Sequence, residues 1–160
     1  NKKEKIRFYE TIYDNNKTYI LNRIFCDTHL SKTHNEREYM YNTLKNNSYI
    51  DFLEDQLNFE DIINTYRQYK FILSPRGNGM DCHRTWECFL LGCIVITKTS
   101  SLDKMWIENK LPVVIIEDWD KLNINNLDRR LNSWYKKYNK FTNKGYINKK
   151  FKNSYWLKNI

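Results

Sequence analysis

FILSPRGNGMDCHRTWECFLLGCIVI, residues 71–96, is the stretch that decides the fold. The short apolar runs at its two ends have the length and composition of buried strands, and a glycine-containing turn and a segment with helical spacing lie between them. Pro75 ends the first strand, because proline donates no amide hydrogen and restricts the residue before it. The stretch therefore predicts a strand, a turn, a helix and a second strand, with polar residues crowded where the first strand passes into the helix.

The rest of the chain alternates strands and helices in the same way. We expect strands at 18–26, 48–53, 70–74, 93–97 and 112–117, and helices at 35–45, 58–69, 81–91, 102–109, 122–139 and 149–158. Residues 112–117 are continuously apolar, which is typical of a strand buried on both faces. This order predicts an α/β fold, a Rossmann-like doubly wound parallel sheet, in a single domain over residues 1–160. Residues 1–17 would be a linker or an edge strand, and residues 122–160 the C-terminal helices.

Composition and charge limit the classes of function. The chain has 160 residues, of which 41% are hydrophobic, and a net charge of +8. This indicates a globular domain whose partners are anionic, unless the charge only reflects a lysine-rich surface. No apolar stretch reaches the roughly 20 residues of a membrane span, and no signal peptide is recognised. We expect a cytoplasmic protein, or a Golgi-lumenal one if the chain is part of a longer enzyme. The four cysteines lack C-x-x-C spacing, so we expect free thiols and no metal site.

A ligand site is predicted where the strand at 70–74 meets the helix that follows. Backbone amides converge at such junctions and bind phosphate groups. Arg84 falls in the first helical turn, where a cation opposes the helix dipole unless an anion is close. Glu87 lies three residues further on, on the same face, and its carboxylate could accept hydrogen bonds from a sugar diol. The expected ligand contacts are Arg76, Gly77, Asn78, Gly79, His83, Arg84, Glu87, Ser100 and Ser101.

Several of these residues also have a purely structural explanation. Gly77 and Gly79 could supply positive φ and admit a phosphate, or serve only a tight turn. Asp81 is expected to cap the helix, where it would compete with a phosphate for the same amides. Ser101 could cap the next helix, and Trp119 could stack on a base or cover the core. No catalytic base is identified.

The same segments resemble a known family, the donor-binding half of the exostosin-like glycosyltransferases. That family includes ribitol xylosyltransferase relatives and homologues in large DNA viruses. The matching residues are FILSPRGNG (71–79), Asp81, HRTWE (83–87), LGCIVI (91–96), LPVVII (111–116) with Asp118 and Trp119, and the NER segment at 35–37. The resemblance covers about residues 18–119, and Val95 stands where such families often have proline.

The resemblance implies the C-terminal domain of a GT-B glycosyltransferase, with a nucleotide sugar, most often a UDP-sugar, as donor. By position, Glu87 would bind the ribose and Arg84 the diphosphate, while Arg76 and the backbone of residues 77–79 would hold the departing phosphate. Transfer to a glycan or other acceptor would invert the anomeric centre without a metal or other cofactor. Such an enzyme needs an N-terminal acceptor domain, so we expect one domain of a larger enzyme, or a reduced protein, and a viral origin in the host cytoplasm.

Two other functions fit the sequence. One is a catalytically inactive domain that binds a nucleotide sugar. The other is a basic module that binds nucleic acid or another polyanion, although no nucleic acid is expected if the donor site is real. The lysines that would carry the second function are in the C-terminal segment: Lys136, Lys137, Lys140, Lys144, Lys149, Lys150 and Lys152.

Overall fold

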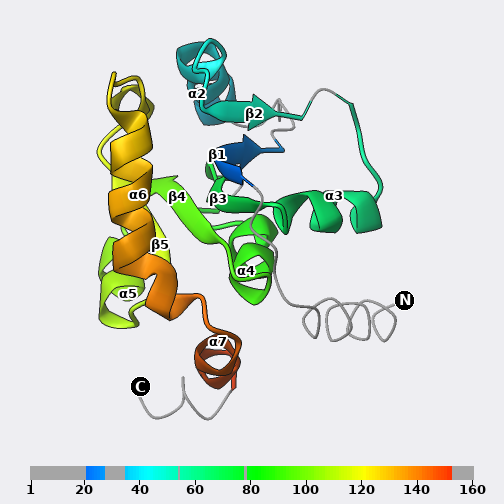
Figure 1. Cartoon of the computed structure of the whole chain (residues 1–160), viewed down its shortest axis with the longest axis vertical. Helices are drawn as coiled ribbons and strands as arrows, with labels where there is room; N and C mark the ends of the chain where they lie inside the picture. The colour runs from blue at the N-terminus through cyan, green and yellow to red at the C-terminus, as the bar shows by residue number, and fades with distance from the viewer. Residues whose placement is uncertain (1–20, 28–34, 54, 78, 153–160) are drawn as a thin grey trace.

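The computed structural model describes residues 21–27, 35–53, 55–77 and 79–152, which form a parallel sheet flanked by helices (Figure 1). Its five strands lie in the order β2-β1-β3-β4-β5. The expected α/β fold with a doubly wound parallel sheet is confirmed. The expected linker or edge strand at 1–17 lies outside the described residues. The strands are β1 Leu21–Cys26, β2 Ile50–Phe52, β3 Tyr69–Leu73, β4 Ile94–Lys98 and β5 Val113–Ile116.

Helices cover both faces of the sheet. One face packs against α2, the 3-10 turn η1 and α6, and the other packs against α3, α4, α5 and α7. The strand residues alternate between these two layers, as the pleat of a strand requires. The bounds are α2 Asn35–Leu44, α3 Phe59–Tyr66, α4 His83–Leu90, α5 Asp103–Glu108, η1 Trp119–Leu122, α6 Leu127–Tyr138, η2 Asn139–Phe141 and α7 Lys144–Lys150.

The direction of winding reverses between β1 and β3. The chain passes from β1 to β2 on one side, then returns across β1 to β3 and continues to β4 and β5. The helix after β1 therefore lies on one face, and the helices after β2, β3 and β4 lie on the other, because parallel crossovers are right-handed. The carboxyl ends of β1 and β3 are neighbours whose following segments leave in opposite directions, and open α/β sheets bind ligands at this switch point.

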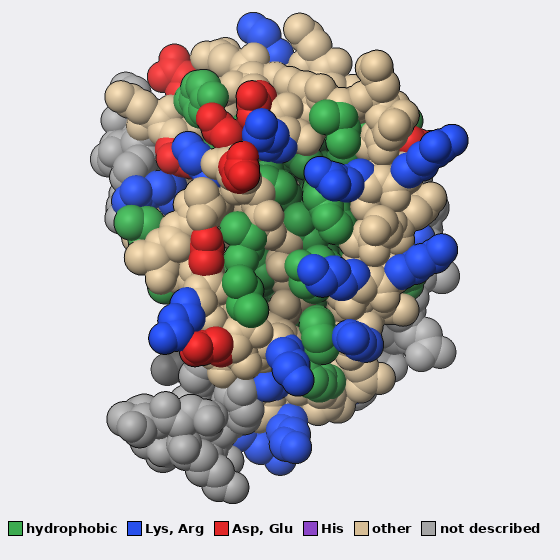
Figure 2. All heavy atoms as spheres, turned by 90° about the vertical axis from the view of Figure 1, so that its left-hand side faces the viewer, with side chains coloured by type: hydrophobic (Ala, Val, Ile, Leu, Met, Phe, Trp, Pro, Cys, Tyr) green, Lys and Arg blue, Asp and Glu red, His purple; other side chains and the backbone are tan. Residues whose placement is uncertain are grey.

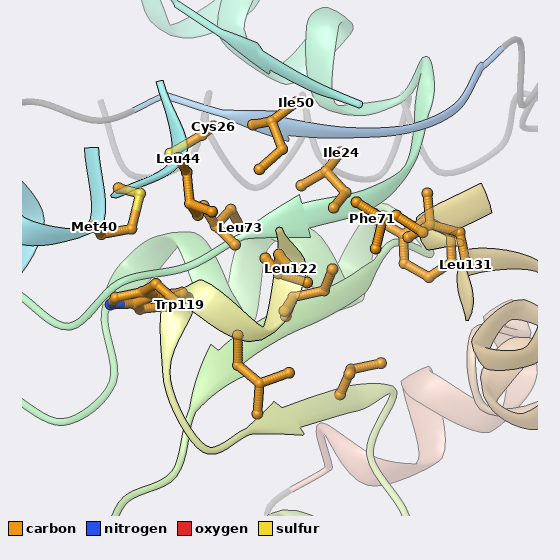
Figure 3. Close-up of a cluster of buried hydrophobic side chains, with 14 of the residues drawn as sticks. Ile24, Cys26, Met40, Leu44, Ile50, Phe71, Leu73, Trp119, Leu122 and Leu131 are labelled. Carbon is orange, nitrogen blue, oxygen red and sulfur yellow. The ribbon is translucent and has the colours of Figure 1, made fainter. Parts of the chain in front are cut away.

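The core beneath α2 and α6 is continuous and apolar (Figure 3). Phe71 and Leu73 project from β3 toward Trp119 and Leu131, and each of these four side chains is fully buried. Trp119 therefore covers the core, the second of the two roles considered for it.

Two element boundaries differ from the sequence prediction. The helix expected at 149–158 is not found there: α7 spans Lys144–Lys150, and residues 153–158 lie outside the described residues. Helix α7 begins at Lys144 because the Asn143 side chain accepts hydrogen bonds from the amides of Gly145 (2.9 Å) and Tyr146 (3.3 Å). Gly145 is thus in the first turn of a helix and does not separate two helices. The helix expected at 122–139 begins only at Leu127, after the turn η1. From the sequence we also expect Asn58 to cap the helix at 58–69, and this is confirmed for α3, since Asn58 Oδ1 accepts from the Asp61 amide at 2.8 Å.

Two helices on the same layer end in the same way with different residues. At the end of α4, the Cys93 amide bonds to the Cys88 carbonyl, and Gly92 has a φ of 71°. At the end of α5, the Leu111 amide bonds to the Trp106 carbonyl, and Lys110 has a φ of 49°. Glycine is the usual residue at this left-handed position, because a Cβ costs roughly 1 kcal/mol there. Lys110 is therefore a lysine at a position that favours glycine.

Substitutions at the C-terminal ends of α4 and α5 should change the stability of the protein in opposite directions. Lys110→Gly should raise the free energy of unfolding by about 0.5–1 kcal/mol, because it relieves the left-handed strain, and Gly92→Ala should lower it by about 1 kcal/mol. Urea denaturation monitored by circular dichroism measures both. A stability loss in Lys110→Gly would contradict the assignment of strain to that residue.

Candidate functional site

The candidate site lies at the carboxyl edge of the sheet, at the switch point between β1 and β3. Asp27 directly follows β1, and residues 74–77 directly follow β3. The first turn of α4 approaches the same edge, since that helix follows β3. The site residues predicted from the sequence around the RGNG turn are therefore at the place where the fold favours a ligand.

A buried ion pair joins the two sides of the switch point. Arg84 Nε pairs with Asp27 Oδ1, and the two side chains are only 9% and 14% exposed. The Tyr66 hydroxyl from α3 donates to the other oxygen, Asp27 Oδ2. Three segments that are distant in sequence, the end of β1, α3 and α4, are thus held by one carboxylate.

The pKa values of Arg84 and Tyr66 are shifted by this network. Burial alone would lower the pKa of Arg84, but Asp27 and Tyr66 favour the charged guanidinium, and the net pKa lies above its ordinary value. Burial, with help from Cys88 and Asp27, raises the pKa of Tyr66, so the phenol keeps the proton that it donates. The network is a carboxylate held by one cation and one neutral donor.

The position of Arg84 corrects part of the sequence interpretation. The helix-dipole argument requires an anion near Arg84, and Asp27 supplies that anion from within the chain. Arg84 is not on an exposed face with Glu87, because it packs toward the core with Thr85 and Cys88 while Glu87 is only half-buried. Arg84 is therefore almost wholly withdrawn from solvent, and its side chain offers little surface to a ligand.

Asp81 does not cap α4, contrary to the prediction. Cys82 is at the N-cap position and makes no capping hydrogen bond with its side chain. The Asp81 carboxylate accepts from the indole Nε1 of Trp86 at 2.7 Å. The expected competition between Asp81 and a phosphate for the first amides of α4 therefore does not arise.

Small polar side chains connect the end of β3 to α4. Ser74 Oγ lies 2.9 Å from Thr85 Oγ1 and 3.3 Å from Cys82 Sγ, and the Thr97 hydroxyl donates to the Ser74 carbonyl at 3.2 Å. Ser74 and Thr85 are buried. These bonds fix the distance between the strand end and the first turn of the helix.

Two arginines flank the turn after β3. Arg37 of α2 donates from Nε to the Arg76 carbonyl at 3.1 Å. A side chain at position 77 would meet Arg37 Nη2 at 3.1 Å, so glycine at 77 lets this guanidinium lie against the turn. Gly77 does not have the positive φ considered from the sequence. The Nε of Arg76 is buried and has no hydrogen-bond partner among the described residues.

A second charged cluster lies where β4 and β5 end. Lys98 Nζ is 3.6 Å from Asp118 Oδ1 and 3.9 Å from Glu36 Oε1, and the Tyr39 hydroxyl donates to Asp118 Oδ2 at 3.1 Å. A hydrogen bond from the Trp119 amide, with help from Tyr39 and Lys98, lowers the pKa of Asp118. This cluster ties α2 to the strand ends beside the switch point.

The remaining predicted contacts are placed as follows. His83 and Gly79 are exposed, whereas Asn78 lies outside the described residues. Ser100 Oγ accepts from the Leu102 amide at 3.1 Å, while Asp103 Oδ1 accepts from the Ser100 amide at 2.8 Å, so Ser100 stabilises the start of α5. Ser101 is exposed and does not cap that helix.

The structure brings three unpredicted residues to the site: Asp27, Arg37 and Tyr66. Two of them had a signal in the sequence. Asp27 is the first polar residue after a predicted strand, and Arg37 belongs to the NER segment at 35–37. Tyr66 had none, because it falls on the apolar stripe of its helix and could not be distinguished from an ordinary core residue.

All four cysteines are free thiols, as expected. Over the described ranges, no group of three or more His, Cys, Asp or Glu side chains is placed to hold a metal ion, and no helix there is long and apolar enough to cross a membrane. In comparisons with known proteins, no family model and no curated sequence matches the chain.

The Asp27–Arg84 pair should contribute more to the free energy of unfolding than any other ion pair among the described residues. Arg84→Met should lower the free energy of unfolding by about 3 kcal/mol, because it leaves a buried carboxylate without its cation. The double variant Asp27→Asn/Arg84→Met should lose much less stability than the sum of the losses in the two single variants. Arg23→Met, which breaks a half-exposed pair with Asp51, is the matched control and should cost about 1 kcal/mol or less.

Urea denaturation of the four proteins of the cycle measures this coupling. Additive losses in the double variant would show that Asp27 and Arg84 act independently.

Proposed function

We propose that this chain is the donor-binding domain of a glycosyltransferase that uses a nucleotide sugar, with a UDP-sugar as the first candidate. The observation that carries the proposal is the buried Nε of Arg76, a cationic donor without an acceptor among the described residues at the switch point of a doubly wound sheet. A buried charged donor is costly when it lacks an acceptor. A phosphate oxygen would supply one.

The surroundings of Arg76 suit a diphosphate. Arg37 adds a second guanidinium against the same turn, and the closely approaching backbone at Gly77 leaves no side chain in the way. Arg84, whose charge is neutralised by Asp27, supports the first turn of α4 and adds no net charge to the site. Departure of a nucleoside diphosphate builds negative charge, and fixed cations stabilise that charge more in the transition state than in the ground state.

The residues on α4 would bind the rest of the donor. Glu87 is half-buried and one turn into the helix, where its carboxylate would accept from the two hydroxyls of the ribose. His83 is exposed at the first position of α4 and would contact the sugar or the phosphate. Transfer to a glycan acceptor would need an acceptor domain and a catalytic base, and the proposal assigns no residue of this chain to that base.

UDP should raise the melting temperature of the protein, because a ligand that binds only the folded state stabilises it by mass action, by about 2.7 kcal/mol at a hundredfold excess over Kd. Arg76→Gln should weaken UDP binding roughly tenfold to a hundredfold, since it removes a charge-assisted contact, and Glu87→Gln should weaken UDP more than inorganic diphosphate. Isothermal titration calorimetry gives both affinities.

Arg67→Gln is the matched control. Arg67 caps the C-terminus of α3, just before β3 begins, and so lies at the opposite edge of the sheet. The loss of one charge there should leave UDP affinity within twofold. Arg84 is unsuited to this test, because its substitution also disturbs the fold. The absence of UDP, GDP or ADP binding at millimolar concentration would refute the proposal, and salt-sensitive binding that ignores Arg76 and Glu87 would favour a polyanion-binding module.

A further inference from the structure

An apolar groove runs beside the edge strand β5, apart from the switch point. Its volume is about 650 Å³, within the roughly 300–1,000 Å³ usual for ligand sites. Helix α5 forms one wall, and the end of α6, η2 and the start of α7 form the other. Figure 2 shows this side of the molecule, with hydrophobic side chains along the hollow, basic side chains along one side of it and both acidic and basic side chains along the other. The exposed apolar lining includes Ile107, whose side chain is 66% exposed.

The backbone of β5 is open toward this groove. The amides of Val95 and Thr99 bond to the carbonyls of Pro112 (2.9 Å) and Ile116 (2.8 Å), so these alternate residues of β5 face β4. The intervening residues, Val113 and Ile115, line the groove and direct their backbone groups away from β4. The register turns the amide and carbonyl of Ile115 away from β4, whereas the Val113 amide is engaged and donates to the Leu111 carbonyl at 2.8 Å. An exposed strand edge of this kind can pair with an added strand.

The charged side chains that line the groove are basic. Among the described residues they are Lys110, Lys137 and Lys140. None of these lysines forms an ion pair with a described residue. Lys110 also occupies the strained left-handed position at the end of α5, where glycine would be more stable. A cation retained there at a cost to stability indicates a use for its side chain.

We propose that this groove binds an extended segment of a partner protein, with alternating apolar residues between acidic flanks, which pairs with β5 as a sixth strand. The apolar side chains would contact Ile107, Phe141 and Tyr146. The backbone would pair with the amide and carbonyl of Ile115, and the acidic flank beside the start of β5 would meet the three lysines. Main-chain pairing of this kind gives affinity, and the flanking charges give orientation.

The charge of the chain favours an acidic partner over a second copy of the chain as the occupant of the groove. Two copies that paired through β5 would bring together two chains that each have a net charge of +8, and like charges oppose association. An acidic partner removes the conflict.

The probe is a fluorescein-labelled, end-blocked peptide in which valine alternates with threonine between two pairs of glutamates. We expect saturable binding by fluorescence anisotropy at peptide or protein concentrations up to about 1 mM. Ile107→Glu should weaken binding at least about tenfold, because it places a negative charge in the exposed floor without changing the core. Lys110→Gly should weaken binding about threefold while making the protein more stable, which separates the loss of binding from any loss of folding.

Two controls are matched to these variants. Lys104→Gln removes a lysine from the same helix outside the groove lining and should leave the affinity unchanged within experimental error. A peptide with methylated amides on alternate residues keeps its side chains but cannot pair along one edge, so one of the two possible methylation patterns should abolish binding.

Four results would overturn the proposal. They are no binding of the acidic peptide, equal affinity for a peptide with lysine flanks, unchanged binding of both methylated peptides, and no effect of Ile107→Glu. Displacement of the peptide by phosphatidylserine vesicles would assign the groove to a lipid surface instead. Sedimentation velocity showing a wild-type dimer that Ile107→Glu dissociates would assign it to a second copy.

Discussion

The carboxylate of Asp27 is the group on which the geometry of the switch point depends. It receives the Arg84 guanidinium from α4 and the Tyr66 hydroxyl from α3. A parallel sheet fixes the order of its strands, but it does not fix how far the first turn of each helix stands from the neighbouring strand end. One buried carboxylate with two donors sets that distance at the place where the two halves of the sheet diverge. A charge buried in this way is stable only with its partners in place, so the arrangement is all-or-none.

The turn after β3 has properties that follow from this anchor. Because Arg84 is held below the turn, Arg76 and Arg37 are the cations that remain beside it, and Gly77 gives Arg37 the space to approach. The arginines at the site therefore have two different roles. Arg84 is neutralised by Asp27 and supports the fold. Arg76 has a donor, Nε, with no acceptor among the described residues.

The sequence predicted the elements better than the contacts between them. Apolar runs with proline or polar ends placed all five strands, because burial on both faces leaves a local signature. The capping residue Asn58 was also recognised locally. By contrast, the partner of Arg84 depends on the neighbouring positions of β1 and β3, and nothing in the spacing of residues 71–96 contains that information. Asp81 differs, because its partner Trp86 is only five residues away and two local bonds, a cap and an indole contact, were both open to its carboxylate. The start of α7 was missed because Gly145 resembles a break, although Asn143 two residues earlier is a capping residue.

The covering of one sheet face by α6 has a consequence for synthesis on the ribosome. Leu127 and Leu131 are fully buried against a layer that includes Ile24 of the first strand, and Asn22 bonds to Asn132 at 3.0 Å. The strands of this layer are complete by Ile116, and α2 covers part of their apolar face, but the part beneath α6 stays uncovered until that helix has left the exit tunnel. During that interval the nascent chain would expose hydrophobic side chains of the sheet, and such a surface is a natural substrate for a chaperone.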